Sequence, residues 1–171
     1  MIHIYADRTK KGEEHEAGRR LLKAGLKEQF GVEVREEEIG RSGKGKPYLK
    51  KQPGIFFNIS HSGEFAVCAL AHAPLGVDIE RHREIRFERV GRKFLTEEEW
   101  KIWEKSSDAQ RYFFDQWVKR EAYLKWKGTG IDRDLRTLEF DGFGEFFPLA
   151  DNYSAAVWTE KPACLCLHFL F

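Results

Sequence analysis

Cysteine, methionine and proline are scarce in this chain, and neither sign of charge dominates it. The 171 residues include 3 cysteines, 5 prolines and 1 methionine. A small, odd cysteine count without the spacing of a disulfide framework favours a reducing, cytoplasmic setting. The formal net charge is only +1, from 29 basic and 28 acidic residues. A nucleic-acid-binding domain usually has a clear basic excess, so we expect no nucleic-acid partner.

Long apolar runs are missing as well. The start, MIHIYADRTK, has no apolar stretch after a basic region, so we expect no secretion signal. No window approaches the roughly 18 apolar residues that a membrane span requires, so we expect no membrane partner. Hydrophobic residues nevertheless make up 42% of the chain and include 14 Phe and 5 Trp. This content supports one packed body, which we expect to be a monomer.

The order of expected strands and helices predicts an α+β fold made of two similar α/β-type halves that meet near Pro74. Helices are expected at 13–30, 87–95, 96–105 and 108–127, with Thr96 and Glu99 forming a capping box. Strands are expected at 1–6, 55–59, 65–71, 76–80, 153–159 and 164–171, and around Phe140. We expect residues 1–74 and 75–171 to form the halves of one compact unit.

One stretch of the chain has no acidic residue. From Ile39 to Gly63 the only charged residues apart from His61 are basic: Arg41, Lys44, Lys46, Lys50 and Lys51. Such a run is typical of a solvated loop, but it could equally hold an anionic ligand. Within it, the residues Ser60–Gly63 are expected to form a turn between two strands.

Two acids share one face of a predicted strand. In the segment GVDIE, Asp78 and Glu80 alternate with Val77 and Ile79. The strand period therefore places both acids on one face, with their Cα atoms about 6.6 Å apart. A half-buried strand with a wet acidic face would explain this pattern without any ligand.

A third acid, Glu121, lies in the apolar stripe of its predicted helix. At about 100° per residue, Phe114 lies about 20° and Trp117 about 40° from Glu121 around the helix axis. Burying a carboxylate there costs several kcal/mol without compensation. An exposed pair with Lys125 would return only about 0.3–0.5 kcal/mol. If Asp78, Glu80 and Glu121 converge, a divalent cation would relieve their repulsion, and all-oxygen ligands favour Mg²⁺ or Mn²⁺ over zinc.

These residues fall in three ordered motifs that resemble those of the 4'-phosphopantetheinyl transferase superfamily. The closer similarity is to its surfactin-synthetase-activating (Sfp-like) class, which consists of single chains with two pseudo-equivalent halves. This resemblance implies a pseudo-two-fold axis between the halves and an active site where they meet. The motifs here are Asn58–Ser62 (NISHS), Gly76–Glu80 (GVDIE) and Trp117–Ala122 (WVKREA) with Lys125, and Lys46–Tyr48 (KPY) matches a further short one. The family usually has Lys where this chain has Arg120, so the charge is kept but the side chain differs.

The resemblance implies an enzyme of the holo-[acyl-carrier-protein] synthase type. Such an enzyme moves 4'-phosphopantetheine from coenzyme A to a serine hydroxyl of an apo acyl or peptidyl carrier protein and releases adenosine 3',5'-bisphosphate. Position by position, the resemblance implies a metal site at Asp78, Glu80 and Glu121, catalytic roles for Glu121 and Lys125, and coenzyme A contacts from Arg19, Lys46, Ser60, His61 and Lys125.

Other interpretations of the same residues are less complete. A serine hydrolase based on Ser60 or Ser62 lacks the G-x-S-x-G elbow, and an adjacent Ser and His seldom form a nucleophile–base pair. A metal-dependent nuclease would not explain the Ser-His motif or the balanced charge. The main alternative is a non-catalytic coenzyme A or carrier-protein binding module, which would not need all three acids together.

Overall fold

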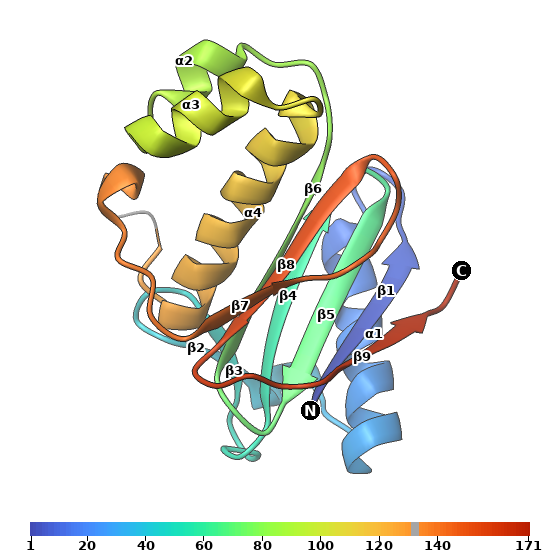
Figure 1. The fold of residues 1–171 in the computed structure, drawn as a ribbon. Coiled ribbons are helices and arrows are strands. Elements are labelled where there is room, and N and C mark those ends of the chain that lie inside the picture. The colour runs from blue at the N-terminus through green and yellow to red at the C-terminus, as the bar shows by residue number, and fades with distance from the viewer. Residues whose placement is uncertain (131–133) are drawn as a thin grey trace.

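The chain folds into two main β-sheets whose inward faces share one hydrophobic core, with helices on the outer faces (Figure 1). The computed structural model describes residues 1–130 and 134–171. The shared core takes its side chains from alternate positions of four strands, as the two-residue period of a strand requires. Separate apolar clusters bury the helices against the outside of each sheet. The expected α+β class is confirmed.

The first sheet has the strand order β4-β5-β1-β9. These strands are β4 (Phe56–Ser62), β5 (Phe65–Ala71), β1 (Ile2–Arg8) and β9 (Leu165–Phe169). β1 runs antiparallel to β5 and parallel to β9. Helix α1 (Glu14–Phe30) covers the outer face with an apolar stripe that includes Leu22 and Leu26, and it ends at Gly31, whose φ of 65° suits glycine.

The second sheet has the strand order β6-β8-β7 and carries the long helix α4 (Ala109–Lys127). Its strands are β6 (Leu75–Arg81), β8 (Tyr153–Thr159) and β7 (Phe143–Phe146). Gly76 lets α4 lie very close to β6, because a Cβ there would overlap the carbonyl oxygen of Ala122 and the amide nitrogen of Trp126. This close approach brings the side chains of α4 to those of β6.

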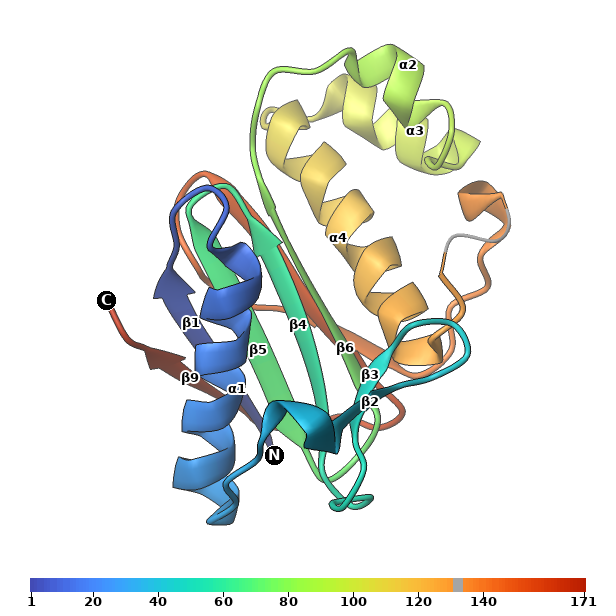
Figure 2. The same ribbon diagram turned by 180° about the vertical axis from the view of Figure 1, so that it is seen from behind.

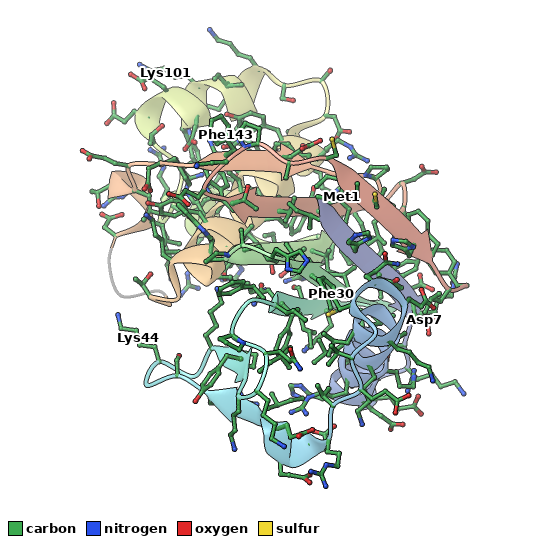
Figure 3. All side chains as sticks on the ribbon, turned by 90° about the horizontal axis from the view of Figure 1, so that it is seen from below. Met1, Asp7, Phe30, Lys44, Lys101 and Phe143 are labelled. Carbon is green, nitrogen blue, oxygen red and sulfur yellow. The ribbon has the colours of Figure 1, made fainter. Side chains whose placement is uncertain are left out.

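Short elements complete the fold. They are η1 (Glu36–Glu38), β2 (Ile39–Arg41), β3 (Pro47–Leu49), α2 (Phe87–Gly91), α3 (Glu97–Lys105) and η2 (Leu135–Thr137). Figure 2 shows η1 and the β2–β3 hairpin on the side of the molecule where α1 and the C-terminal end of α4 are found. Figure 3, seen from below, shows Lys44 at the tip of this hairpin.

The structure corrects several sequence-based boundaries. β4 continues through Ser62, so the turn predicted at Ser60–Gly63 is wrong for its first three residues, and the chain reverses at Gly63 and Glu64. The helix expected at 87–95 ends at Gly91. The strand expected around Phe140 begins at Phe143.

The last strand, β9, pairs with β1 rather than with the sheet of the segment 75–171. The second half therefore contributes a strand to the sheet of the first. The division at residue 74 and the two-fold relation stay predictions. Among the helices that the structure describes, none combines the length and the hydropathy needed to cross a bilayer.

Candidate functional site

In the part of the chain that the structure describes, no ladder of backbone hydrogen bonds links β4 to β6. Polar side chains of β4 join the two sheets instead. The side-chain oxygens of Asn58, Ser60 and Ser62 lie 2.8, 3.4 and 3.1 Å from successive alternate amides of β6 and accept hydrogen bonds from them. The alternation of a strand places all three on the β6 side. The pattern N-x-S-x-S thus satisfies backbone donors that would otherwise be buried without partners.

Lys125 connects α4 to this β4–β6 seam, which consists of Asn58, Ser60, Ser62 and the β6 amides that they bind. Its ammonium lies 2.6 Å from Asp78 Oδ1, donates to Ser60 Oγ at 3.0 Å and to the Val77 carbonyl at 3.1 Å. The Ser60 hydroxyl in turn donates to Asp78 Oδ1 at 2.8 Å. Burial raises the pKa of the Asp78 carboxyl, and the Lys125 ammonium opposes that rise. The structure therefore brings Asp78, Ser60 and Lys125 into one hydrogen-bonded group.

Glu121 lies one helical turn before Lys125 and is half-buried. Within the described part of the chain, its carboxylate has no hydrogen bond or ion pair. Burial raises the pKa of Glu121, and the charges of Asp78 and Glu80 raise it further, against the opposing charge of Lys125. A carboxyl group with a raised pKa accepts a proton more readily than an ordinary carboxylate, and it can also bind a cation.

Glu80 lies at the outer end of the seam. The Ser62 hydroxyl and Arg83 Nη1 each donate to Glu80 Oε2 at 2.8 Å. Three carboxylates thus neighbour one another at the junction of β6 and α4, and their oxygen donors suit Mg²⁺ or Mn²⁺. Glu121 is the best candidate for a metal ligand, because it is half-buried and its carboxylate has no hydrogen bond or ion pair among the described residues. Within residues 1–130 and 134–171, however, no three acidic, His or Cys side chains converge as metal ligands.

A basic cleft of ≈ 690 Å³ lies between α1, the turn η1 and β4. Arg19 and His61, both expected to contact coenzyme A, line it together. The lining also includes the basic side chains of Arg20, Lys23 and Arg41. This cleft could hold an anionic ligand, which is one of the two interpretations left open for the acid-free stretch.

Two other expected coenzyme A ligands lie outside the lining of this cleft. Ser60 is buried in the seam with Asp78. Lys46 lines a neighbouring cavity, and its ammonium donates to the carbonyls of Leu75, Lys125 and Trp126 at 3.0, 2.6 and 3.2 Å. Burial lowers the pKa of Lys46 to about 8. In this structure Lys46 ties the β2–β3 hairpin to the C-terminal end of α4.

The contacts of three residues at or beside the site were not predicted from the sequence. Asn58 binds a β6 amide, and the alternating N-x-S-x-S pattern was the available signal. Glu36 lies in the basic cleft and pairs with Arg19, and no local signal indicated it. Arg120 is 1% exposed and turns away from the acids toward α3, where its Nη2 lies 2.6 Å from Glu99 Oε2. Arginine at this position therefore serves the packing of α4 against α3.

Comparison with known proteins gives matches along almost the whole chain. Residues 74–169 match the model of the 4'-phosphopantetheinyl transferase superfamily, and residues 8–73 match the model of the 4'-phosphopantetheinyl transferase N-terminal region. The chain is 30% identical over 164 aligned residues to the 4'-phosphopantetheinyl transferase psf-1 of Bacillus pumilus, covering 85% of this chain and 70% of the relative.

Two further relatives show the same similarity over a shorter part of their length. The 4'-phosphopantetheinyl transferase Sfp of Bacillus subtilis (strain 168) is 31% identical over 116 residues, which are 67% of this chain and 52% of the relative. The human L-aminoadipate-semialdehyde dehydrogenase-phosphopantetheinyl transferase is 29% identical over 140 residues, which are 73% of this chain and 45% of the relative. The chain thus spans about half the length of these two relatives.

Proposed function

The chain belongs to the 4'-phosphopantetheinyl transferase superfamily, and from this premise we propose that it transfers the 4'-phosphopantetheine group of coenzyme A to a serine hydroxyl of an apo acyl or peptidyl carrier protein. Adenosine 3',5'-bisphosphate is the second product of this reaction. The observation that carries the proposal is the group of Asp78, Glu121 and Lys125 at the junction of β6 and α4, where α4 presses closely on β6 at Gly76.

We assign the nucleotide end of coenzyme A to the basic cleft. Arg19 and His61 line it together, and a guanidinium can hold a phosphate through two parallel hydrogen bonds. Two further residues complete the proposed coenzyme A contacts: Ser60 from the β4–β6 seam and Lys46 from the β2–β3 hairpin. Because Lys46 and Ser60 bond to groups of the second sheet and of α4, they would link ligand binding in the first half to the acids in the second.

We assign the chemistry to Glu121 and Lys125. Glu121, whose pKa is raised, would accept the proton of the attacking serine hydroxyl. Lys125 would bind the pyrophosphate and stabilise charge on the leaving side, while Asp78 and Ser60 hold its ammonium in place. Mg²⁺, or Mn²⁺, held by Asp78, Glu80 and Glu121 would supply charge neutralisation at the pyrophosphate.

The remaining proposals concern the whole chain. We propose that residues 1–74 and 75–171 form two pseudo-equivalent halves with the active site between them, which the meeting of the two matched segments at residues 73 and 74 supports. We propose a cytoplasmic monomer, and the free state of all three cysteines supports the reducing setting.

One assay separates the proposed transferase from a non-catalytic binding module. The chain is incubated with coenzyme A and an apo-carrier protein, with Mg²⁺ or with excess chelator, and adenosine 3',5'-bisphosphate is quantified. The transferase releases the bisphosphate only when carrier, coenzyme A and divalent cation are all present. A chain that binds coenzyme A but releases no bisphosphate under any of these conditions would be a binding module.

A further inference from the structure

An acidic residue lies among the cations of the basic cleft. Glu36 Oε2 bonds to Arg19 Nη1, and Glu36 Oε1 lies 3.3 Å from Lys23 Nζ. Glu16, the other acid in the lining, pairs with Arg20 at 3.4 Å. The cations on this side of the cleft thus face internal anions before any ligand enters. An incoming phosphate has to compete with a carboxylate for Arg19.

The turn that carries Glu36 is held in place by neighbouring contacts. The carboxylate of Glu38 accepts from the Arg35 amide at 2.9 Å and pairs with Lys51 at 2.6 Å. The Lys50 ammonium donates to the Glu37 carbonyl at 2.7 Å. Lys50 and Lys51 follow directly after β3, so the hairpin anchors η1 against the opening of the cleft. Glu36 therefore keeps its position near Arg19 without depending on that one ion pair.

The ion pair of Arg19 and Glu36 is exposed enough for another anion to replace Glu36. The side chains of Arg19 and Glu36 are 34% and 56% exposed. Ion pairs in such positions are weak, because water solvates both partners well when they separate. A phosphate monoester carries more charge than a carboxylate and offers three acceptor oxygens, so it can displace Glu36 from Arg19. When the phosphate leaves, Glu36 is still close enough to bind Arg19 and Lys23 again.

We propose that Glu36 is an internal competitor for the 3'-phosphate of the nucleotide, which weakens the hold of Arg19 and Lys23 on that phosphate and so promotes release of adenosine 3',5'-bisphosphate. This inference rests on the proposed function, because it takes the basic cleft as the nucleotide site. Coenzyme A and the bisphosphate carry the same 3'-phosphate, so Glu36 lowers affinity for both. The product has lost the pantetheine arm and its contacts, so the same competition leaves it less firmly held.

The test measures binding of adenosine 3',5'-bisphosphate by calorimetry at fixed ionic strength, with adenosine 5'-phosphate as the ligand that lacks the 3'-phosphate. Glu36→Gln removes the competing charge and keeps the shape. We expect it to bind the bisphosphate about three- to tenfold more tightly, the range for relieving an exposed ion pair with two cations. Its affinity for adenosine 5'-phosphate should equal that of the wild type.

The matched control is Glu33→Gln, which removes an exposed carboxylate that pairs with Lys27 outside the cleft lining. It should leave both affinities unchanged. Unchanged or weaker binding of the bisphosphate by Glu36→Gln would overturn the inference. If the wild type does not bind the bisphosphate, or if Arg19→Ala binds it equally well, the assignment of the nucleotide site fails instead, so the two failures are distinguishable.

Discussion

Lys125 and Glu121 lie one turn apart on α4, yet only one of them has bonded partners among the described residues. The Lys125 ammonium is held by Asp78, Ser60 and a backbone carbonyl, so it compensates the buried charge of Asp78. Besides Lys125, the charged groups near Glu121 are Asp78 and Glu80, whose charges have the same sign as its own. The residue with partners stabilises the folded state, and the residue without them carries the reactivity that we propose.

Loss of Lys125 should therefore destabilise the protein through Asp78. We expect Lys125→Met to lower the free energy of unfolding by about 2 kcal/mol, less than for a fully buried pair because water reaches part of the lysine. The double variant with Asp78→Asn should recover most of this loss in chemical denaturation. Lys127→Met removes an exposed pair with Asp141 and should destabilise the protein much less than Lys125→Met does. If the double variant is as unstable as Lys125→Met alone, Lys125 does not act through Asp78.

Neutralising Glu121 should stabilise the fold at neutral pH while it removes activity. Because the folded-state pKa is raised, the folded chain holds this proton more tightly than the unfolded chain, and stability declines as pH rises through the folded-state pKa. Glu121→Gln avoids this decline. We expect the free energy of unfolding of Glu121→Gln at pH 7 to be about 0.5–2 kcal/mol higher than that of the wild type. The advantage should vanish below the ordinary glutamate pKa, and an equal advantage at pH 4 and pH 7 would contradict this account.

At the scale of elements, local signals predicted the helices better than the strands. Thr96 and Glu99 form the expected capping box of α3, and the Asp108 carboxylate accepts from the Arg111 amide at the start of α4. These signals depend only on neighbours in sequence. The serines of β4 have turn-like composition, but their hydroxyls bond to β6, about 18 residues away, and so remain in a strand. Strand ends depend on such distant partners, which composition does not reveal.

The joint between α3 and α4 depends on Arg120. Its guanidinium pairs with Glu99, donates to the carbonyls of Leu135 and Gln116, and lies over the rings of Phe94 and Phe140. We expect Arg120→Met to lower the free energy of unfolding by about 3 kcal/mol, because Glu99 loses its ion-pair partner and two carbonyls lose donors.

Arg120→Lys should recover only part of that stability, since one ammonium cannot reproduce the planar fork of a guanidinium. The control is Lys101→Met on the exposed side of α3, which should change stability by less than about 0.5 kcal/mol. Urea unfolding of the variants measures these differences. Arg120→Met with wild-type stability would mean that Arg120 does not join the two helices.

At the scale of the whole molecule, the sequence motifs identified the acids but not their surroundings. Strand period and helix angle placed Asp78, Glu80 and Glu121 on faces that could meet, and the structure puts them in mutual electrostatic contact. The basic cleft forms only when η1 and α1 lie together, so Glu36 could not be connected with Arg19 beforehand. The return of β9 to the first sheet likewise depends on a pairing over the length of the chain.

The most direct test of the account is the intact mass of an apo-carrier protein after incubation with coenzyme A, Mg²⁺ and the chain. The wild type should add one phosphopantetheine group to the carrier's serine. Glu121→Gln, folded as judged by its unfolding curve, should slow that addition by at least about a hundredfold. A series of apo acyl and peptidyl carriers left at their original mass by the wild type, or modified equally fast by Glu121→Gln, would contradict the account.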